Sequence, residues 1–384
     1  MSTKKALSIV AVVVLLVPAA FYAWAYASTD ESGLARAIVW RDADVSDYRR
    51  FPSTTLEASE RPLILDHPPS RDIAPLGPAI PGGNVDAFME RTQTAAFIAI
   101  RGRELLHERY FNGYDQDSTV TTFSVAKSFV SALVGIAIDD GSLALEDSVT
   151  DHVPELLERD ERFEHITVRH LLTMSSGLRW SEQGLPWSDD AETYNGSDLR
   201  RLAIEDTEVV SPPGERFVYN PYNTLLLGLV LERATRQSVT EFMEERLWKP
   251  MGAGARGSWS IDSTETRFEK MESGLNGRAV DLAKLGLVYL RDGIVRGQRI
   301  LPSEWVAEST AYGNDVDPST AYQYHWWTYR DTDVGEWFLA QGNKGQFIGV
   351  FPSADLVIAR FGIDFGYARW PELLADLAAE ISGG

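Results

Sequence analysis

The sequence contains no cysteine and only six histidines. Without cysteine, disulfide bonds, thiolate nucleophiles, zinc–cysteine sites, iron–sulfur clusters and lipid-modified cysteine anchors are all excluded. No pair of histidines forms the H-E-x-x-H motif, which argues against a zinc protease. His165 and His170 are therefore expected to be structural, and the sequence predicts neither a metal ion nor a cofactor.

Basic residues are also scarce: 36 Lys and Arg stand against 56 Asp and Glu, a net charge of −20 over 384 residues. A chain this acidic repels phosphate backbones, so nucleic acid is not expected as a partner. Hydrophobic residues make up 44% and charged residues 24%, which is a globular composition rather than a disordered or fibrous one. Some of the eleven Trp side chains are expected to line a pocket.

One long apolar run stands near the N-terminus. Residues 6–27 contain a single polar side chain, Ser8, and are long enough for one bilayer crossing of about 20 residues. Lys4 and Lys5 precede the run and acids follow it, which directs the body of the chain out of the cytoplasm. We expect an uncleaved signal anchor that tethers an extracytoplasmic protein to the membrane. The alternative is a cleaved signal peptide with a small-x-small site at 25–27, giving a secreted or periplasmic protein.

The remaining chain divides into two unequal parts. After the leader, at 1–29, residues 30–84 form an extracytoplasmic lead-in. Prolines interrupt it repeatedly between residues 62 and 81, so it is expected as an extended wrap or tether. Residues 85–384 form the folded body. The elements expected there are strands at 95–100 and 104–111, a buried helix at 124–140, a helix at 280–289, strands at 337–340, 346–351 and 356–361, and a last helix at 371–381.

An S-x-x-K motif, Ser124 to Lys127, begins the buried helix. On a helix these positions lie on one face, so the hydroxyl and the amine can meet. A serine nucleophile needs a base, and a lysine can serve where burial or positive neighbours keep it neutral. The motif alone is weak evidence, because Ser2 to Lys5 also matches it in the leader and because Ser124 could be a simple helix cap.

Three segments in order give the motif more weight. Residues 122–128 resemble the nucleophile motif of the serine β-lactamase and penicillin-binding protein superfamily, in its class C and esterase branch, and residues 141–155 and 166–178 are similar to the segments that follow. The resemblance covers about residues 85–384. It implies an α/β (α+β) fold of the β-lactamase/transpeptidase type: an antiparallel sheet flanked by helices, with an inserted, mostly helical region.

The resemblance also assigns the other catalytic elements. Tyr219 falls on the family's catalytic tyrosine, which carries the leaving-group proton. Pro221 stands where the family usually has Asn, and Asn223 could replace that amide in holding a substrate carbonyl. The family's third motif is normally K-T-G or H-x-G on an edge strand of the sheet. Gly342 aligns with its glycine, so the backbone N–H groups of Ser124 and Asn343 would form the oxyanion hole. A shifted register with Lys344–Gly345 as the motif is the alternative.

The third motif also indicates which branch of the family the sequence resembles. With Gly342 in register, Ala340 and Gln341 occupy the positions of the usual cation and hydroxyl, so the grip on a substrate carboxylate is missing. The pattern looks more like the 6-aminohexanoate-dimer hydrolase and carboxylesterase branch. Residues that agree with it, and that we expect in the substrate pocket, are Trp180, Asn223, Trp327, Gly342 and Gln346. Trp187 is also expected there, because it shares with Trp180 and Tyr194 an irregular stretch that we interpret as a lid or pocket wall, the alternative being core filling.

Three functions remain open at this point. The first is a serine hydrolase that cleaves small-molecule esters or small amides through an acyl-enzyme, using Ser124, Lys127 and Tyr219. Trp180 stands where the nylon-oligomer enzyme has a tyrosine that assists amide cleavage, and since an indole cannot donate that proton, esters are favoured. The second is a β-lactamase or D-amino-acid peptidase acting on cell-wall-related substrates. The third is a catalytically silent binding protein of the same fold.

Overall fold

The centre of the fold is a seven-stranded antiparallel sheet assembled from both ends of the chain. The computed structural model describes residues 17–66, 76–314, 316–317 and 320–383. In spatial order the strands of the large sheet are β3 (Glu104–Tyr110), β2 (Thr94–Arg101), β13 (Leu356–Gly362), β12 (Gln346–Phe351), β11 (Gly335–Gly342), β10 (Trp326–Asp331) and β9 (Tyr322–Gln323).

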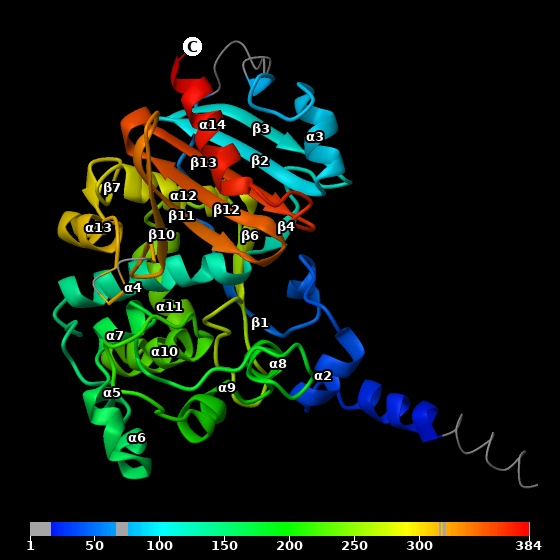
Figure 1. Cartoon of the computed structure of the whole chain (residues 1–384), viewed down its shortest axis with the longest axis vertical. Coiled ribbons are helices and arrows are strands. Elements are labelled where there is room, and N and C mark those ends of the chain that lie inside the picture. The colour runs from blue at the N-terminus through cyan, green and yellow to red at the C-terminus, as the bar shows by residue number, and fades with distance from the viewer. Residues whose placement is uncertain (1–16, 67–75, 315, 318–319, 384) are drawn as a thin grey trace, which may run out of the picture.

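Each face of this sheet is covered by helices, because its strands are apolar on both sides. On β2, Phe97 and Ala99 belong to one hydrophobic core, while Ala96 and Ile98 belong to the other. The first face packs against α3 (Val85–Arg91) and α14 (Trp370–Gly383), and the second against α12 (Ala279–Leu290). Helix α4 (Ala126–Asp139) runs between the sheet and the helical region below it (Figure 1).

The helical region is inserted between the two halves of the large sheet and packs around α4. Apolar side chains cover nearly the whole circumference of α4, so it is buried on all sides. The helices of this region are α5 (Val149–His152), α6 (Pro154–Arg159), α7 (Val168–Leu172), α8 (Asp189–Asn195), α9 (Leu199–Arg201), α10 (Pro221–Thr235) and α11 (Val239–Met243).

A smaller four-stranded sheet leads the chain into α4. Its strands lie in the order β1 (Ser53–Leu56), β5 (Gly257–Ser260), β6 (Leu275–Arg278) and β4 (Thr119–Thr121). Between the helical region and the end of the large sheet lie the β7 (Ile294–Val295) and β8 (Gln298–Arg299) hairpin and helix α13 (Ser303–Ser309). Because β4 ends three residues before Ser124, this sheet fixes where the predicted nucleophile begins its turn.

The sequence predicted most of these elements. The hairpin of β2 and β3, the buried helix, the helix at 280–289, the three C-terminal strands and the last helix are confirmed, with ends shifted by a few residues. The predicted fold class, an antiparallel sheet flanked by helices with a helical insertion, is confirmed as well. The buried helix starts at Ala126 because residues 123–125 form a tighter 3₁₀ turn.

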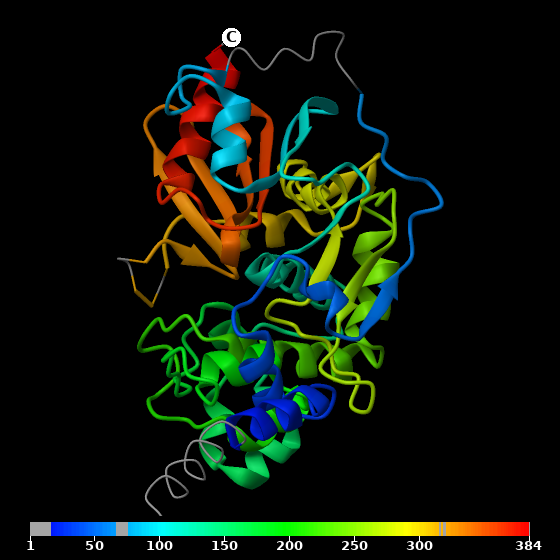
Figure 2. The same cartoon turned by 90° about the vertical axis from the view of Figure 1, so that its right-hand side faces the viewer.

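The lead-in packs against the body along its described length. Helix α2 (Gly33–Trp40) rests on α8, β1 pairs with β5, and Leu63 and Asp66 hydrogen-bond to the backbone of the body. Figure 2 shows this blue segment running along the outside of the molecule from the helical region toward the large sheet. The proline pattern predicted an extended wrap or tether but not α2, whose start Ser32 caps through its side chain. We call residues 33–47 the strap.

The predicted membrane anchor lies partly outside the described residues, since it begins at residue 6 and the description begins at residue 17. Residues 17–27 are helical. Within the described ranges, the helices all fall short of the length and apolar character needed to cross a bilayer. The division of the chain at residues 29 and 84, and the extracytoplasmic location, stay predictions.

Candidate active site

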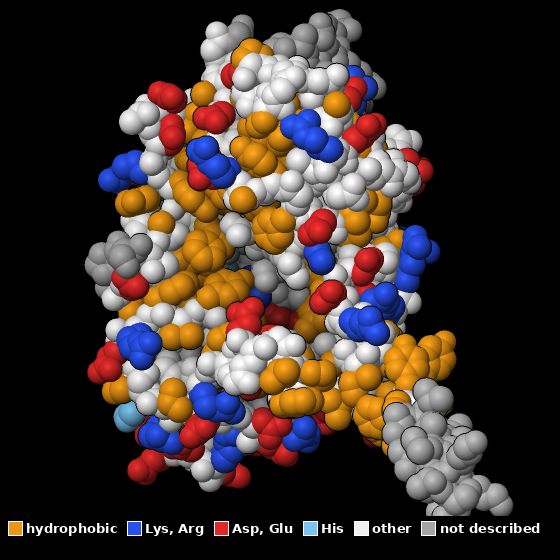
Figure 3. Space-filling model, turned by 45° about the vertical axis from the view of Figure 1, so that its right-hand side comes forward, with side chains coloured by type: hydrophobic (Ala, Val, Ile, Leu, Met, Phe, Trp, Pro, Cys, Tyr) orange, Lys and Arg blue, Asp and Glu red, His pale blue; other side chains and the backbone are white. Residues whose placement is uncertain are grey.

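A cavity of about 710 Å³ lies between the sheet-bearing half of the molecule and the helical region. The space-filling view shows the molecule hollowed there, with acidic side chains at the rim (Figure 3). The wall draws on residues from distant parts of the chain, namely 37–43, 123–127, 180–195, 219–221, 272–273 and Asn343. The cavity therefore brings together Ser124, Lys127, Tyr219 and Asn343, the residues to which the sequence assigned catalysis. Their catalytic roles stay predictions.

Ser124 sits in a strained turn. Phe123, the residue before it, has a φ of +47°, a left-handed conformation that is costly for a bulky side chain. Burial of the Phe123 ring, which is 2% exposed, and two hydrogen bonds from Thr122 to the carbonyl of Leu275, at 2.9 and 2.8 Å, hold the turn in place. The strain directs the partly exposed Ser124 into the cavity, ahead of α4.

Lys127 lies one turn further along and reaches back to Ser124. Its Nζ lies 3.0 Å from Ser124 Oγ and donates a second bond, 2.8 Å long, to the backbone carbonyl of Glu272. The residue is only 2% exposed, so these two oxygens and the cavity are its immediate polar surroundings. The amine is thereby fixed in position to exchange a proton with the serine hydroxyl.

Tyr219 faces the same amine from the helical region. Lys127 Nζ lies 5.3 Å from the centroid of its ring, and the ring stacks on Trp327 at 6.0 Å. The backbone turns immediately afterwards, because Asn220 caps α10 and Pro221 occupies its first turn. Asn220 also donates to the carbonyl of Leu178 at 3.2 Å, which ties the Tyr219 loop to the segment before Trp180.

Among the described residues, none of those lining the cavity is a histidine. His325 lies beneath Lys127, with its Nδ1 3.1 Å from the Lys127 carbonyl. Burial, together with the neighbouring Lys127 charge, lowers the pKa of His325 to about 3, so the ring is neutral at physiological pH.

The end of strand β11 touches the Ser124 turn. A Cβ added to Gly342 would lie 2.5 Å from the carbonyl oxygen of Thr122 and 3.2 Å from the nitrogen of Ser124. Only glycine allows this approach. Gly345, the alternative motif glycine, instead faces Arg360. Ser124 and Asn343 both lie in the first residues of 3₁₀ turns, where N–H groups have no acceptor within the turn, and both line the cavity.

A buried arginine holds the hairpin that carries Asn343. Arg360 on β13 is 0% exposed and donates to the carbonyls of Lys344, at 3.2 Å, and Gly345, at 2.7 Å. Burial lowers the pKa of Arg360 to about 9, which still leaves the guanidinium charged at neutral pH. Its remaining donors go to Thr94 and to the carbonyls of Thr92 and Asp364. By holding the two residues that follow Asn343, Arg360 fixes the position of the Asn343 N–H.

Only some of the residues predicted for the substrate pocket line the cavity. Trp180 lines the cavity. Gly342 and Trp327 do not line it, but each contacts a residue group that does: Gly342 packs against the Ser124 turn, and Trp327 stacks on the Tyr219 ring. Trp187 does not line the cavity: it is 65% exposed, and its neighbours Leu185 and Pro186 form the wall instead.

Two predicted amides are likewise turned away from the cavity. Asn223 is 1% exposed, and its amide donates to the Asn220 carbonyl at 2.9 Å, because the first turn of α10 directs it into the core. Gln346 is 0% exposed and donates to the Gly362 carbonyl at 2.7 Å, so it pairs β12 with β13. Neither side chain lines the cavity, so neither can hold a substrate carbonyl in this arrangement.

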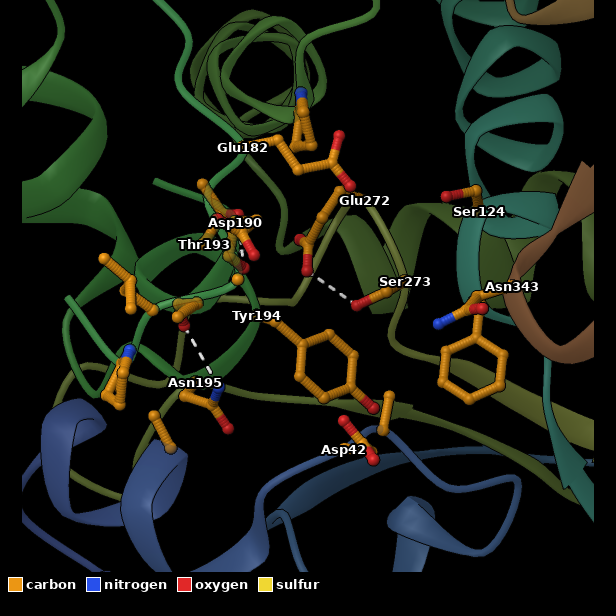
Figure 4. A pocket seen from close by; sticks show the side chains of 18 of the residues that line it. Asp42, Ser124, Glu182, Asp190, Thr193, Tyr194, Asn195, Glu272, Ser273 and Asn343 are labelled. Atoms are coloured by element: carbon orange, nitrogen blue, oxygen red, sulfur yellow. Dashed lines mark hydrogen bonds between the residues drawn. The ribbon is translucent and has the colours of Figure 1, made fainter. Parts of the chain in front are cut away.

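Sequence reasoning missed two parts of the wall. Glu272 and Ser273 lie on the floor, where Ser273 Oγ donates to Glu272 Oε1 at 2.6 Å (Figure 4). Glu272 holds Lys127 through its backbone carbonyl, a contact that no side-chain motif records. The strap supplies the second part, and the composition of the lead-in gave no sign of it.

Comparison with known proteins identifies the family. The sequence model of the Beta-lactamase family matches residues 83–371. The chain belongs to the β-lactamase family. It is 26% identical over 328 residues to the 6-aminohexanoate-dimer hydrolase of Paenarthrobacter ureafaciens, covering 78% of this chain and 81% of that protein. The resemblance inferred from the motifs is confirmed, and this β-lactamase-family protein belongs among hydrolases.

Solved structures agree on the fold. A Bacillus anthracis protein described as a 6-aminohexanoate-dimer hydrolase superposes with a TM-score of 0.75 at 21% identity, covering 91% of this chain and 95% of that one. A class C β-lactamase superposes with a TM-score of 0.62 at 15% identity, covering 83% and 99%. At such identities these structures establish the architecture of this β-lactamase-family protein and leave its substrate to be argued from the cavity.

Proposed function

We propose that this protein is a serine hydrolase that cleaves esters, and small amides more slowly, through an acyl-enzyme formed on Ser124. The observation that carries the proposal is the 3.0 Å contact between Lys127 Nζ and Ser124 Oγ inside a substrate-sized cavity. A serine hydroxyl is a weak nucleophile unless a positioned base removes its proton. Lys127 is the positioned base.

The residues divide the reaction as follows. Lys127 takes the proton of Ser124 as Oγ attacks the substrate carbonyl carbon, and the N–H groups of Ser124 and Asn343 hold the oxyanion. Tyr219 delivers a proton to the leaving alcohol or amine as the bond to the carbonyl carbon breaks, and Lys127 restores that proton to the phenol. Water then attacks the acyl-enzyme, losing its proton along the same path, and Ser124 leaves with its hydroxyl restored.

The charges of the side chains that line the cavity favour a neutral or cationic substrate. Four lining side chains are carboxylates, Asp42, Glu182, Asp190 and Glu272, whereas the lining cations are Arg41 and Lys127. Lys127 is engaged with Ser124, which leaves Arg41 as the lining cation free to meet an anion. Trp180 lines the cavity, and its indole cannot supply a proton to a leaving amine. Both features favour esters over β-lactams and over peptides that end in a carboxylate.

A serine-directed probe tests the proposal. A fluorophosphonate is expected to add once to the wild type, at Ser124, and to block hydrolysis of p-nitrophenyl acetate. Ser273 is the matched control because it also lines the cavity, but its hydroxyl donates to Glu272 rather than facing an amine. Labelling of Ser273, or no labelling with no turnover, would contradict the proposal, and the second result would favour a silent binding protein. Trapping of a fluorescent penicillin with faster turnover of β-lactams than of esters would favour a β-lactamase.

Replacing Tyr219 by phenylalanine is expected to lower kcat for p-nitrophenyl acetate by about 10²- to 10⁴-fold, the range for losing a positioned proton carrier. The ring stays on Trp327, so the fold and KM are expected to change little. Tyr322→Phe is the matched control, because that buried phenol packs against Tyr219 without lining the cavity. Equal losses in the two variants, measured by steady-state kinetics, would assign Tyr219 a packing role only.

Adding one methyl group at Gly342 is expected to lower kcat/KM by about 100-fold or more, the loss typical of an impaired oxyanion hole. The new Cβ would meet the Thr122 carbonyl at 2.5 Å, so β11 must move away from Ser124. Hydrolysis rates and thermal unfolding of Gly342→Ala check this, with Glu336→Ala at the exposed start of the same strand as control. Full activity in Gly342→Ala would place the oxyanion donors elsewhere.

A further inference from the structure

The strap forms one wall of the cavity, although it lies outside the part of the chain that matches the family. Ala37, Ile38, Arg41, Asp42 and Ala43 all line the cavity, whereas the family match begins at residue 83. In Figure 4 the blue ribbon of the strap lies across the cavity from Ser124 and Asn343. A substrate that extends away from Ser124 therefore meets side chains that the family's motifs do not specify.

One end of the strap is anchored by a buried arginine. Arg36 is 1% exposed, and one of its terminal nitrogens donates to the carbonyls of Asn195 at 3.2 Å, Gly196 at 3.1 Å and Asp262 at 2.7 Å. Its other donors bind the carbonyls of Thr29 and Asp30 at 2.7 and 3.2 Å. Because all of its nitrogens donate to backbone carbonyls, the Arg36 guanidinium fixes α2 on the C-terminal end of α8.

The contact between α2 and α8 leaves no space for a side chain where the helices are closest. A Cβ added to Gly33 would lie 2.9 Å from the Cα of Gly196. Ser197 Oγ donates to the Glu31 carbonyl at 2.9 Å beside this contact. The two helices therefore meet at a fixed separation, and Ala37 and Ile38 from α2 line the cavity together with Ala191 from α8.

The other end of the strap is held next to the Ser124 turn. The N–H of Thr121 donates to the carbonyl of Val45 at 3.0 Å. The hydroxyl of Tyr194 on α8 donates to the Asp47 carboxylate at 2.6 Å. The strap thus spans the cavity from α8 to β4, fixed at both ends, which is the construction of a permanent wall rather than of a tether.

We infer that the strap determines substrate size, with Ile38 limiting the length of the apolar group that extends from the reacting carbonyl toward α2 and α8. This inference rests on the proposed esterase function and adds its substrate class: esters whose acyl or alcohol chain is short and apolar. Ala37, Ile38 and Ala191 all line the cavity, and their side chains are hydrocarbon. Ile38 is half-buried, so part of its side chain remains free to meet the substrate.

Shortening Ile38 tests the inference. With p-nitrophenyl esters from acetate to octanoate, and with acetates of alcohols from ethanol to octanol, Ile38→Ala is expected to raise kcat/KM for the longest members about tenfold relative to the shortest, in one series or the other. Leu34→Ala is the matched control, because Leu34 lies on the same helix, is 42% exposed and does not line the cavity. An unchanged length profile in both series would overturn the inference.

Freeing the strap gives an independent check. Arg36→Met removes every hydrogen bond that the Arg36 side chain makes. Cleavage by a protease within residues 29–47 is therefore expected to accelerate, and the dependence of kcat/KM on chain length is expected to broaden as in Ile38→Ala. A freed strap with an unchanged profile contradicts the inference; if this variant does not fold, the Ile38 pair decides alone. Fluorophosphonate labelling separates the two claims: a wild type that is not labelled refutes the proposed function, whereas labelled variants with unaltered profiles refute only the role of the strap.

Discussion

Ser124→Ala is expected to lower kcat for p-nitrophenyl acetate by about 10⁶-fold, the loss seen when a serine hydrolase loses its nucleophile. The substitution removes one oxygen that lies 3.0 Å from Lys127 Nζ and leaves the cavity otherwise unchanged. Substrate binding, which the wall of the cavity provides, should persist. Steady-state kinetics should therefore show a large fall in kcat with little change in the affinity for a non-hydrolysable ester analogue.

The fall must not come from unfolding, and the structure indicates that it will not. Lys127 keeps its bond to the Glu272 carbonyl, so the lost contact with Ser124 is worth only about 1 kcal/mol of stability. Thermal unfolding of Ser124→Ala should thus lie within a few degrees of the wild type. Ser273→Ala, in the same cavity, is the control and should retain most of the activity. Comparable losses in the two variants would remove Ser124 from its assigned role.

The fold could be predicted largely because it depends on local patterns. A short apolar run at 95–100, followed by a turn at 101–103, specifies the β2–β3 hairpin, and a longer continuous apolar run specifies α4. Pairing between chain ends far apart, such as β2 with β13, follows from no local pattern. It is indicated by the order of the elements, in which strands near both ends of the body enclose a helical region. Helix α2 was missed because it is eight residues long and its stability comes from Arg36 and the surface of α8.

In the candidate site, too, the features set by local spacing could be predicted, and those set by long-range packing could not. The contact of Ser124 with Lys127 is set by helical spacing, which a sequence displays directly. Asn223 and Gln346 were assigned to the pocket by the resemblance to the family, but the orientation of their elements turns both into the core. The strap shows the opposite error, since residues without any catalytic signature line the cavity through long-range packing. Spacing reveals side chains that act together on one element, and tertiary packing decides the rest.

Lys127→Met is expected to lower kcat for p-nitrophenyl acetate by about 10⁴-fold, because the variant keeps Ser124 and the oxyanion donors but has no group to accept the serine proton. Methionine has similar length and suits a position that is 2% exposed. The Glu272 carbonyl loses its donor, at a cost of about 1–3 kcal/mol, which a thermal unfolding measurement will reveal. Reaction with a fluorophosphonate, measured over time, should slow in parallel with kcat.

Lys127→Arg distinguishes a base from a fixed charge. Arginine retains a positive charge and hydrogen-bond donors near Ser124 and Glu272, but a guanidinium cannot be deprotonated in a protein. If Lys127 acts by accepting the proton of Ser124, the arginine variant should be nearly as inactive as the methionine variant. If Lys127 serves only as a charge that orients Ser124 or stabilises the oxyanion, the arginine variant should recover much of the activity. Because overpacking could also inactivate it, its melting temperature and its affinity for a non-hydrolysable ester must match the wild type before the comparison is made.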